Sequence, residues 1–474
     1  MMIYGNEVKR IPRELKEALK IGGYSLIIKG LAGTGKTTLA LELISSLEQE
    51  NMTGIYFTAR VAPAQLVSHY PWALKVIPKE RFIDARGGLM VQDVPYATVI
   101  KYSDVPDFLK NLFYMIDIAP KKPVTVVIDS LEELKANLSF PEDNFSIERR
   151  LLELSYQNTA NIIFITERKK VGKLDYLVDG IIKLERVIEN GRVFRYFIIE
   201  KMRGIPIASP VYIYTLEKAH FSYLTPHNKE LKEDCIQKDF YKYLFRSSLP
   251  TEEVENTNNE YSLIKYVMLN SSATLFTVSK DIGANYFIFL FGYLEVSLEN
   301  KEKVIFVPSM EIKYPRVQQL AQILSKIYSD EVGNLHTIDP MEIYEKSLSP
   351  RQILEILENK IISLQKEKDN NPIHLVMVLN KYKFSTDKSH MDINSFIDEL
   401  LKFVAVYKIR LTVFNISQNY MNESIQSRFT AHLLLSKKQG APIVTGISPH
   451  TNHFSIGLLK NGENKYFLKL VPII

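Results

Sequence analysis

Hydrophobic and polar positions alternate along the first 225 residues in blocks of two kinds. Short, nearly continuous apolar runs, as at 24–28, are typical of buried parallel strands. The segments between them repeat apolar residues at helical spacing, as in 105–113. Two further strands, 178–185 and 194–201, flank an Asn-Gly hairpin turn. This order predicts an α/β domain with a mostly parallel sheet, flanking helices and a C-terminal β-hairpin.

A glycine-rich segment lies between the first strong strand and the helix behind it. Residues 30–38 read Gly-Leu-Ala-Gly-Thr-Gly-Lys-Thr-Thr, the phosphate-loop pattern G-x-x-x-x-G-K-[ST] in its strand–loop–helix context. The glycines let backbone N–H groups converge on an anion, and the helix N-terminus adds unpaired donors. Lys36 is expected to reach the β- and γ-phosphates of ATP, and Thr37 to ligate Mg²⁺. The residues expected to bind the nucleotide are Gly30, Ala32, Gly33, Thr34, Gly35, Lys36, Thr37 and Thr38.

A second apolar run, 124–128, ends in Asp129. Ligands of parallel sheets bind at the carboxyl ends of the strands, and a phosphate loop needs an aspartate partner for its Mg²⁺. We therefore expect Asp129 and Thr37 to form the metal site. Capping of the helix that follows is the alternative role of Asp129, and the two roles are compatible.

Five motifs occur in a fixed order: GTGKTTLA at 33–40, VIDSL at 127–131, ITER at 165–168, LVDGII at 177–182 and KMRG at 201–204. Together they resemble the RecA-superfamily ATPases of the KaiC type. IPREL at 11–15 and TARVAP at 58–63 resemble, more specifically, the P-loop domain of archaeal gas-vesicle regulatory proteins of the GvpD type. The resemblance covers residues 1–225. It implies a RecA-like fold, ATP and Mg²⁺ as ligands, and a homo-oligomer such as a hexamer.

The same resemblance implies catalytic roles for three charged residues. In KaiC-type rings the K-x-R-G motif reaches the nucleotide of the neighbouring subunit, so Lys201 and Arg203 become expected trans-acting fingers. Solvated charges at a strand end are the alternative for both. Glu167 ends the strand beside the phosphate-loop strand, where it can sense the γ-phosphate or form a surface salt bridge.

One departure from the family pattern weakens the expectation of hydrolysis. Where these ATPases carry a glutamate pair that activates water, this chain has Arg60 and Val61. A general base needs a proton-accepting group, and the arginine guanidinium stays protonated. Hydrolysis is therefore expected to be slow, to use Glu167 as a substitute base, or to be absent.

The rest of the chain predicts a linker and a second domain. Charged and Asn-rich residues at 226–258 are typical of a linker. Within 259–474, Asn380 ends an apolar run 97 residues after Gly283, as Asp129 follows Gly35 after 94 residues. We therefore expect a second, degenerate RecA-like domain. Ala284 and Asn285 replace the lysine and threonine of the loop, so this domain is expected to be a scaffold or partner surface.

Composition adds few constraints. A single cysteine excludes an intramolecular disulfide and favours a cytoplasmic protein. The longest apolar run, 286–294, is too short to cross a membrane. The net charge of +5 neither requires nor excludes contact with nucleic acid.

Two functions fit these observations. The first is an ATP-dependent regulatory or signalling switch that acts on a protein partner. The second is a recombination or repair accessory ATPase, similar to RadA paralogues, that binds DNA. For the second function, the candidate DNA-binding loop is the basic segment 168–173, Arg-Lys-Lys-Val-Gly-Lys.

Overall fold

The computed structural model describes residues 8–85, 98–99, 105–137, 146–158, 160–168, 171–224, 271–308, 335–338, 348–367, 370–379, 393–416, 421–460 and 466–474. These residues fall into two compact units, one within Val8–Pro226 and the other within His227–Pro472. The expected linker 226–258 and the expected strand-end residue Asn380 lie outside the described residues.

The first unit is built on an eleven-stranded sheet in the order β1-β11-β10-β9-β8-β2-β7-β6-β3-β4-β5. Strands β8, β2, β7, β6, β3, β4 and β5 are parallel, and β9, β10, β11 and β1 continue the sheet in antiparallel pairs. The strands are β1 Val8–Lys9, β2 Ser25–Gly30, β3 Thr53–Thr58, β4 Phe82–Asp84, β5 Thr98–Val99, β6 Val124–Asp129, β7 Asn161–Thr166, β8 Gly180–Glu189, β9 Arg192–Met202, β10 Val211–Thr215 and β11 Ser222–Leu224.

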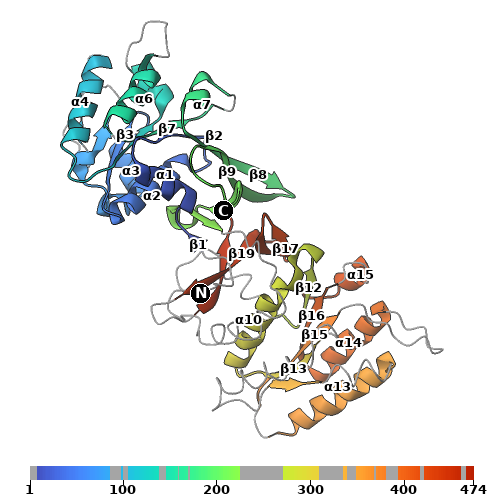
Figure 1. Ribbon diagram of the computed structural model, residues 1–474. Helices are drawn as coiled ribbons and strands as arrows, with labels where there is room; N and C mark the ends of the chain where they lie inside the picture. The colour runs from blue at the N-terminus through green and yellow to red at the C-terminus, as the bar shows by residue number, and fades with distance from the viewer. Residues whose placement is uncertain are drawn as a thin grey trace. The chain divides into compact units, whose positions relative to one another are not determined.

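Helices cover both faces of this sheet (Figure 1). On one face α1 (Arg13–Ile21), α2 (Lys36–Gln49) and α3 (Pro63–His69) contribute to one apolar cluster. On the other, a second cluster contains residues of α4 (Val105–Asp117), α5 (Leu131–Asn137) and α6 (Ser146–Asn158). Alternate residues of β6 divide between them, since Val127 belongs to the first cluster and Val126 and Ile128 to the second. The short helix α7 (Lys173–Leu177) precedes β8.

The second unit repeats the arrangement with nine strands in the order β14-β13-β15-β16-β12-β17-β18-β19-β20. Its strands are β12 Ala273–Val278, β13 Lys303–Val307, β14 Leu335–Thr337, β15 Ile373–Leu379, β16 Arg410–Asn415, β17 Ala431–Lys438, β18 Ala441–Ser448, β19 His453–Lys460 and β20 Tyr466–Pro472. Helices α13 (Pro350–Gln365) and α14 (Ile393–Tyr407) pack on one face. Helix α10 (Tyr286–Glu299) meets the other face through ring contacts such as Phe276–Phe289. The short helix α15 (Glu423–Gln426) precedes β17.

The two sheets can be matched strand by strand. β12, β13, β15, β16, β17 and β18 occupy the places that β2, β3, β6, β7, β8 and β9 hold in the first sheet. In both sheets the pairing becomes antiparallel at the same point, β8–β9 and β17–β18. The predicted fold class, α/β with mostly parallel sheets and a terminal hairpin, is thus confirmed.

Candidate nucleotide-binding site

The phosphate loop joins β2 to α2 at the carboxyl edge of the first sheet. Gly33 and Gly35 have φ values of 75° and 85°, in the left-handed region that favours glycine. Gly35 is also close to the residue that follows β10, because a Cβ at position 35 would lie 2.8 Å from a methyl group of Leu216. Gly30 lies equally close to β8, because a Cβ added at position 30 would lie 2.6 Å from the carbonyl oxygen of Leu184. The glycines predicted from the motif are therefore required by backbone conformation and by close packing.

Hydrogen bonds fix the loop from both sides. The Thr34 hydroxyl donates to the Leu31 carbonyl at 2.8 Å, and the Thr34 N–H donates to the same oxygen at 3.3 Å. From the antiparallel strands, the Tyr214 hydroxyl donates to the Thr34 carbonyl, and Arg195 donates to the Gly33 carbonyl at 3.0 Å. The loop thus has a defined shape that its neighbours maintain.

Lys36, the first residue of α2, turns back into the loop. Its Nζ donates to the Gly30 and Leu31 carbonyls at 2.8 and 2.9 Å, and only 8% of its side chain is exposed. Burial lowers the pKa of Lys36, while the carboxylates of Glu167 and Asp129 act in the opposite direction. An ammonium in this place can exchange carbonyl contacts for the oxygens of a phosphate.

Thr37 and Asp129 meet as predicted from the sequence. The Thr37 hydroxyl donates to Asp129 Oδ2 at 2.7 Å, and the buried Tyr56 hydroxyl donates to the same oxygen at 2.5 Å. Burial and the charge of Asp129 raise the pKa of Tyr56 well above its usual value, so Tyr56 remains a hydrogen-bond donor. β3 and β6 are adjacent parallel strands, and this pairing brings Tyr56 beside the end of β6.

The oxygen atoms of Thr37 and Asp129 suit Mg²⁺, which takes one or two protein ligands and fills its other positions with water and phosphate oxygens. Among the residues that the structure describes, no group of three or more His, Cys, Asp or Glu side chains could hold a metal ion.

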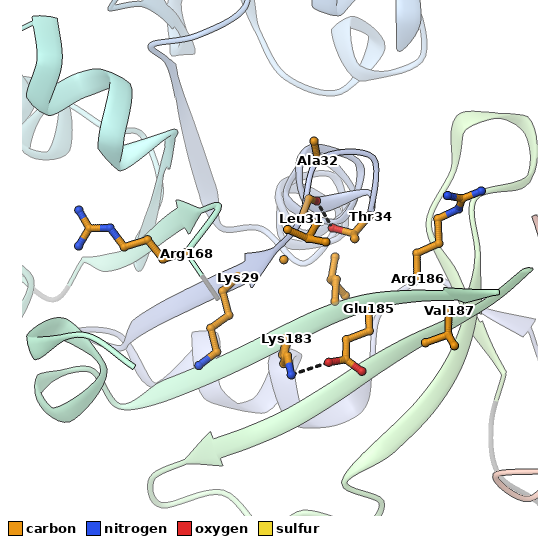
Figure 2. Close-up of a pocket in the computed structure, with 11 residues that line it drawn as sticks. Lys29, Leu31, Ala32, Thr34, Arg168, Lys183, Glu185, Arg186 and Val187 are labelled. Atoms are coloured by element: carbon orange, nitrogen blue, oxygen red, sulfur yellow. Dashed lines mark hydrogen bonds and ion pairs between the residues drawn. The ribbon is translucent and has the colours of Figure 1, made fainter. Parts of the chain in front are cut away.

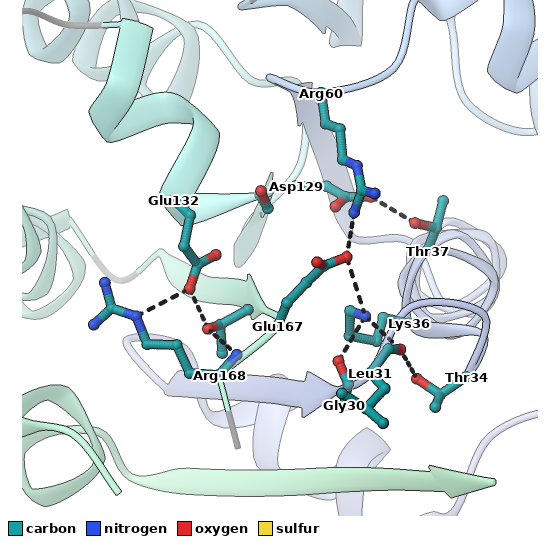
Figure 3. A network of polar contacts seen from close by, with 12 residues as sticks. Gly30, Leu31, Thr34, Lys36, Thr37, Arg60, Asp129, Glu132, Glu167 and Arg168 are labelled. Carbon is teal, nitrogen blue, oxygen red and sulfur yellow. Dashed lines mark hydrogen bonds and ion pairs between the residues drawn. The ribbon is translucent and has the colours of Figure 1, made fainter. Parts of the chain in front are cut away.

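Arg60 and Glu167 form an ion pair above the loop (Figure 3). Arg60 follows β3, and Glu167 follows β7; Glu167 Oε1 also lies 3.9 Å from Lys36 Nζ. Glu167 is therefore near the phosphate loop, and its Oε1 faces two cations, Arg60 and Lys36. Val61, in contrast, packs against the apolar cluster of α1–α3 and does not belong to the polar network drawn in Figure 3.

The sequence analysis did not identify Glu132 or its contacts with Thr166 and Arg168. Glu132 Oε1 accepts a hydrogen bond from the Thr166 hydroxyl and pairs with Arg168 Nε at 3.3 Å (Figure 3). The Arg168 N–H also donates to the Thr166 hydroxyl, at 3.2 Å. The available signal was position: Glu132 lies in the first turn of a helix that begins directly after the Asp129 strand.

Lys201 and Arg203, the predicted fingers, lie beside α7 near the end of β9. Lys201 Nζ donates to the Val178 and Asp175 carbonyls at 2.5 and 3.0 Å, and Arg203 donates to the Tyr176 carbonyl at 3.1 Å. Neither belongs to the polar network around Lys36 in the described part of the chain. Action on a neighbouring subunit stays a prediction, because these contacts concern a single chain.

A cavity of about 370 Å³ adjoins the other side of the phosphate loop (Figure 2). Loop residues Gly30, Leu31, Ala32 and Thr34 form one wall, and residues 183–187 of β8 form another. Lys29 also lines the cavity. Burial alone would lower the pKa of Lys29, but ion pairs with Glu200 and Asp175, at 2.6 and 3.1 Å, outweigh it and raise that pKa. Arg168, which pairs with Glu132, also lines this cavity, so the cavity and the polar network around the loop adjoin each other.

A parallel α/β sheet, a phosphate loop at its carboxyl edge and an aspartate beside the loop threonine define a P-loop nucleotide-binding domain. Residues 18–225 match the family model described as "ATPase: KaiC". This segment is therefore a KaiC-like ATPase domain, and the resemblance predicted from the motifs is confirmed.

The relatives found share this part of the chain. Protein GvpD2 of Halobacterium salinarum is 26% identical over 231 residues, which are 46% of this chain and 45% of GvpD2. Protein GvpD1 of the same organism is 25% identical over 227 residues, 45% of this chain and 41% of GvpD1. The chain thus spans less than half the length of these curated relatives. The crystal structure of the KaiC-like protein PH0186 from Pyrococcus horikoshii OT3 matches with a TM-score of 0.36 and 19% identity, covering 46% of this chain and 100% of that one.

Within the described residues, no helix is long and apolar enough to cross a membrane.

Proposed function

We propose that this chain is an ATP-dependent regulatory switch whose first domain binds Mg-ATP and hydrolyses it slowly. One observation carries the proposal: Lys36, Thr37 and Asp129 converge at the mouth of an ordered phosphate loop. We assign ATP binding to residues 1–225, a linker to 226–258 and partner binding to 259–474, and we place the protein in the cytoplasm as a homo-oligomer, with a hexamer as the form to test.

Each residue of the site has a part in holding the nucleotide. Backbone N–H groups of 31–37 and the Lys36 ammonium would bind the β- and γ-phosphates. Thr37 and Asp129 would hold Mg²⁺, which supplies positive charge to the phosphate oxygens when bound. Tyr56 fixes the Asp129 carboxylate through its hydrogen bond, so the ligand geometry exists before binding.

The switch would act through the Arg60–Glu167 pair. Both side chains are partly exposed, at 48% and 39%, and both face the region of Lys36. A γ-phosphate attracts Arg60 and Lys36 and repels Glu167, so ATP and ADP would favour different positions of this pair. A differential contact of this kind is what a nucleotide-dependent change in a partner surface requires.

DNA binding, the alternative function, has less support. Arg168 begins the basic segment 168–173, and its guanidinium pairs with Glu132 inside the site. Lys169 and Lys170 lie outside the described residues. A salt-dependent DNA titration with and without ATP tests this alternative directly.

The proposed function is tested by titrating the full chain with a fluorescent ATP analogue in Mg²⁺. We expect Lys36→Ala to weaken binding by about a hundredfold, because a charge-assisted contact to phosphate is lost. Lys20→Ala is the matched control, since Lys20 is an exposed lysine of α1 and should leave the affinity unchanged. Equal affinity of wild type and Lys36→Ala would exclude the proposal.

A further inference from the structure

Glu132 has two carboxylate oxygens in different situations. Oε1 is fixed by the Thr166 hydroxyl and by the Arg168 guanidinium, both from the end of β7. Oε2 is buried and has no hydrogen-bond partner among the described residues. An unpaired buried oxygen is costly, and such a group calls for a physical reason. A water molecule or a substrate group that is bound only during function supplies one.

Glu132 also lies where a reacting group would need it. In Figure 3 it projects from the first turn of α5 toward Arg168 at the end of β7, next to the strand that carries the phosphate loop. Its charge acts on the pKa of Lys36, although less strongly than the charge of Glu167 does. Glu132 and the phosphate-binding lysine therefore belong to one electrostatic site.

Glu167, the substitute base predicted from the sequence, is held by cations. Its Oε1 pairs with Arg60 and lies 3.9 Å from Lys36 Nζ, and both cations would also attract the γ-phosphate. Among the described residues, Glu132 forms one ion pair, with Arg168 through Oε1, and its buried Oε2 has no hydrogen-bond partner. Oε2 is therefore an acceptor position that a water molecule can fill.

We propose that Glu132 is the carboxylate that orients and deprotonates the attacking water, an inference that rests on the proposed binding of ATP. A water proton passes to Glu132 Oε2 while the water oxygen forms a bond to the γ-phosphorus. The bond between that phosphorus and the β,γ-bridging oxygen breaks, and ADP leaves with the electron pair. The proton on Glu132 then passes to solvent, so the products are ADP, phosphate and one released proton.

Thr166 and Arg168 are positioning residues in this assignment. They hold Oε1 and thereby fix the direction of Oε2. In this assignment, a glutamate of helix α5, which follows β6, takes the role of the missing glutamate pair at 60–61. Arg60, which stands at one position of that pair, holds Glu167 in an ion pair and adds a positive charge beside the loop.

The test measures hydrolysis in a single turnover and binding of a fluorescent ATP analogue, both with the full chain and Mg²⁺. We expect Glu132→Gln to reduce hydrolysis at least a hundredfold while ATP affinity changes less than threefold. Glu133→Gln is the matched control, because Glu133 is the exposed neighbour on the same helix. Glu167→Gln should lose less activity than Glu132→Gln. Formate should partly restore turnover to Glu132→Ala, which a purely structural role of Glu132 would not allow.

The outcomes separate this inference from the proposed function. A large loss in Glu167→Gln with near wild-type hydrolysis in Glu132→Gln would assign the base to Glu167 and overturn the inference. Wild type that binds ATP but hydrolyses it no faster than Lys36→Ala would overturn it as well, with the binding switch intact. Failure of wild type to bind ATP would remove the proposed function itself.

Discussion

The two units share a strand order and differ in where they place their charged side chains. In the first, Lys36, Asp129, Glu132 and Glu167 gather at the carboxyl edge of the parallel strands, where α/β sheets bind ligands. In the second, the strands that correspond to β6 and β7 end in Leu379 and Asn415. Within the part of the chain that the structure describes, the same architecture therefore places charged groups at the ends of these strands in the first unit, and a leucine and an asparagine in the second.

The second unit concentrates its charges at the opposite edge. Arg410 begins β16 and pairs with Glu302, just before β13, at 2.6 Å. His374, near the start of β15, is fully buried and contacts Glu302 at 3.1 Å and the Thr412 hydroxyl at 2.9 Å. Tyr293 of α10 also contacts the Thr412 hydroxyl, at 2.9 Å. This cluster connects helix α10 and the residue before β13 with strands β15 and β16, and its contacts are those of a structural element.

The comparison teaches that a shared fold does not carry a shared function. Polar groups at the carboxyl edge can contact a ligand, whereas the side chains of the Glu302 cluster are largely buried and contact one another. Substitutions in the two clusters should therefore have different effects, on ligand binding in the first unit and on stability in the second.

The largest effect is expected from Glu302→Gln, which removes the buried ion-pair partner of Arg410, a side chain that is only 13% exposed. Breaking a buried pair in this way costs about 3–5 kcal/mol. Trp72 is the only tryptophan of the sequence and lies in the first unit. Its fluorescence therefore follows the unfolding of the first unit in urea, whereas circular dichroism follows the unfolding of both units. We expect the dichroism transition to move to lower urea while the fluorescence transition and ATP affinity stay unchanged. Exposed Glu423→Gln is the control; a shift of both transitions would argue against separate roles.

A somewhat smaller loss of stability is expected when the pH is lowered. Burial lowers the pKa of His374 from its ordinary value of 6.5 to about 4, so the folded protein keeps this imidazole neutral where the unfolded chain binds a proton. The stability contributed by neutral His374 is complete above pH 6.5 and declines as the pH falls toward 4, by about 3 kcal/mol in total. Unfolding free energies of wild type and His374→Gln across this range test it. An equally steep decline in His374→Gln would contradict the assignment to His374.

The smallest effect is expected from Tyr56→Phe in the first unit. It removes one hydrogen bond from Asp129 and should cost about 1 kcal/mol of stability, with a few-fold loss of Mg-ATP affinity. Tyr212→Phe is a matched control, because Tyr212 also donates to a buried carboxylate, Glu14, at 2.6 Å. Affinity that falls equally in both variants would mean that Tyr56 acts only through stability.

The sequence predicted the parts of the site that depend on local order. Lys36 and Thr37 follow from the loop motif, and Asp129 follows from the rule that parallel strands end at one edge. The Arg60–Glu167 pair and the partners of Glu132 were not predictable, because they depend on how the ends of β3, β6 and β7 lie relative to one another. Lys201 and Arg203 were assigned from a motif alone, and their contacts with α7 become visible only in the fold.

The same limit applies to the architecture. Strand β10 was not expected, since its residues Val211–Thr215 form a short apolar stretch without a turn motif that marks a partner strand. Its neighbour β9 was expected because Asn190-Gly191 defines the hairpin. Side-chain periodicity thus identified the elements that bury whole faces, and it was weakest for the antiparallel strands at the sheet's margin.

The clamped phosphate loop has a consequence for the speed and entropy of binding. Tyr214 and Arg195 hold its carbonyls from outside, and Lys36 holds it from within. A ligand that meets a loop already in shape spends little of its interaction energy on ordering the backbone. Nucleotide association should therefore be limited by diffusion and by exchange of the Lys36 carbonyl contacts, with no slow folding step of the loop in between.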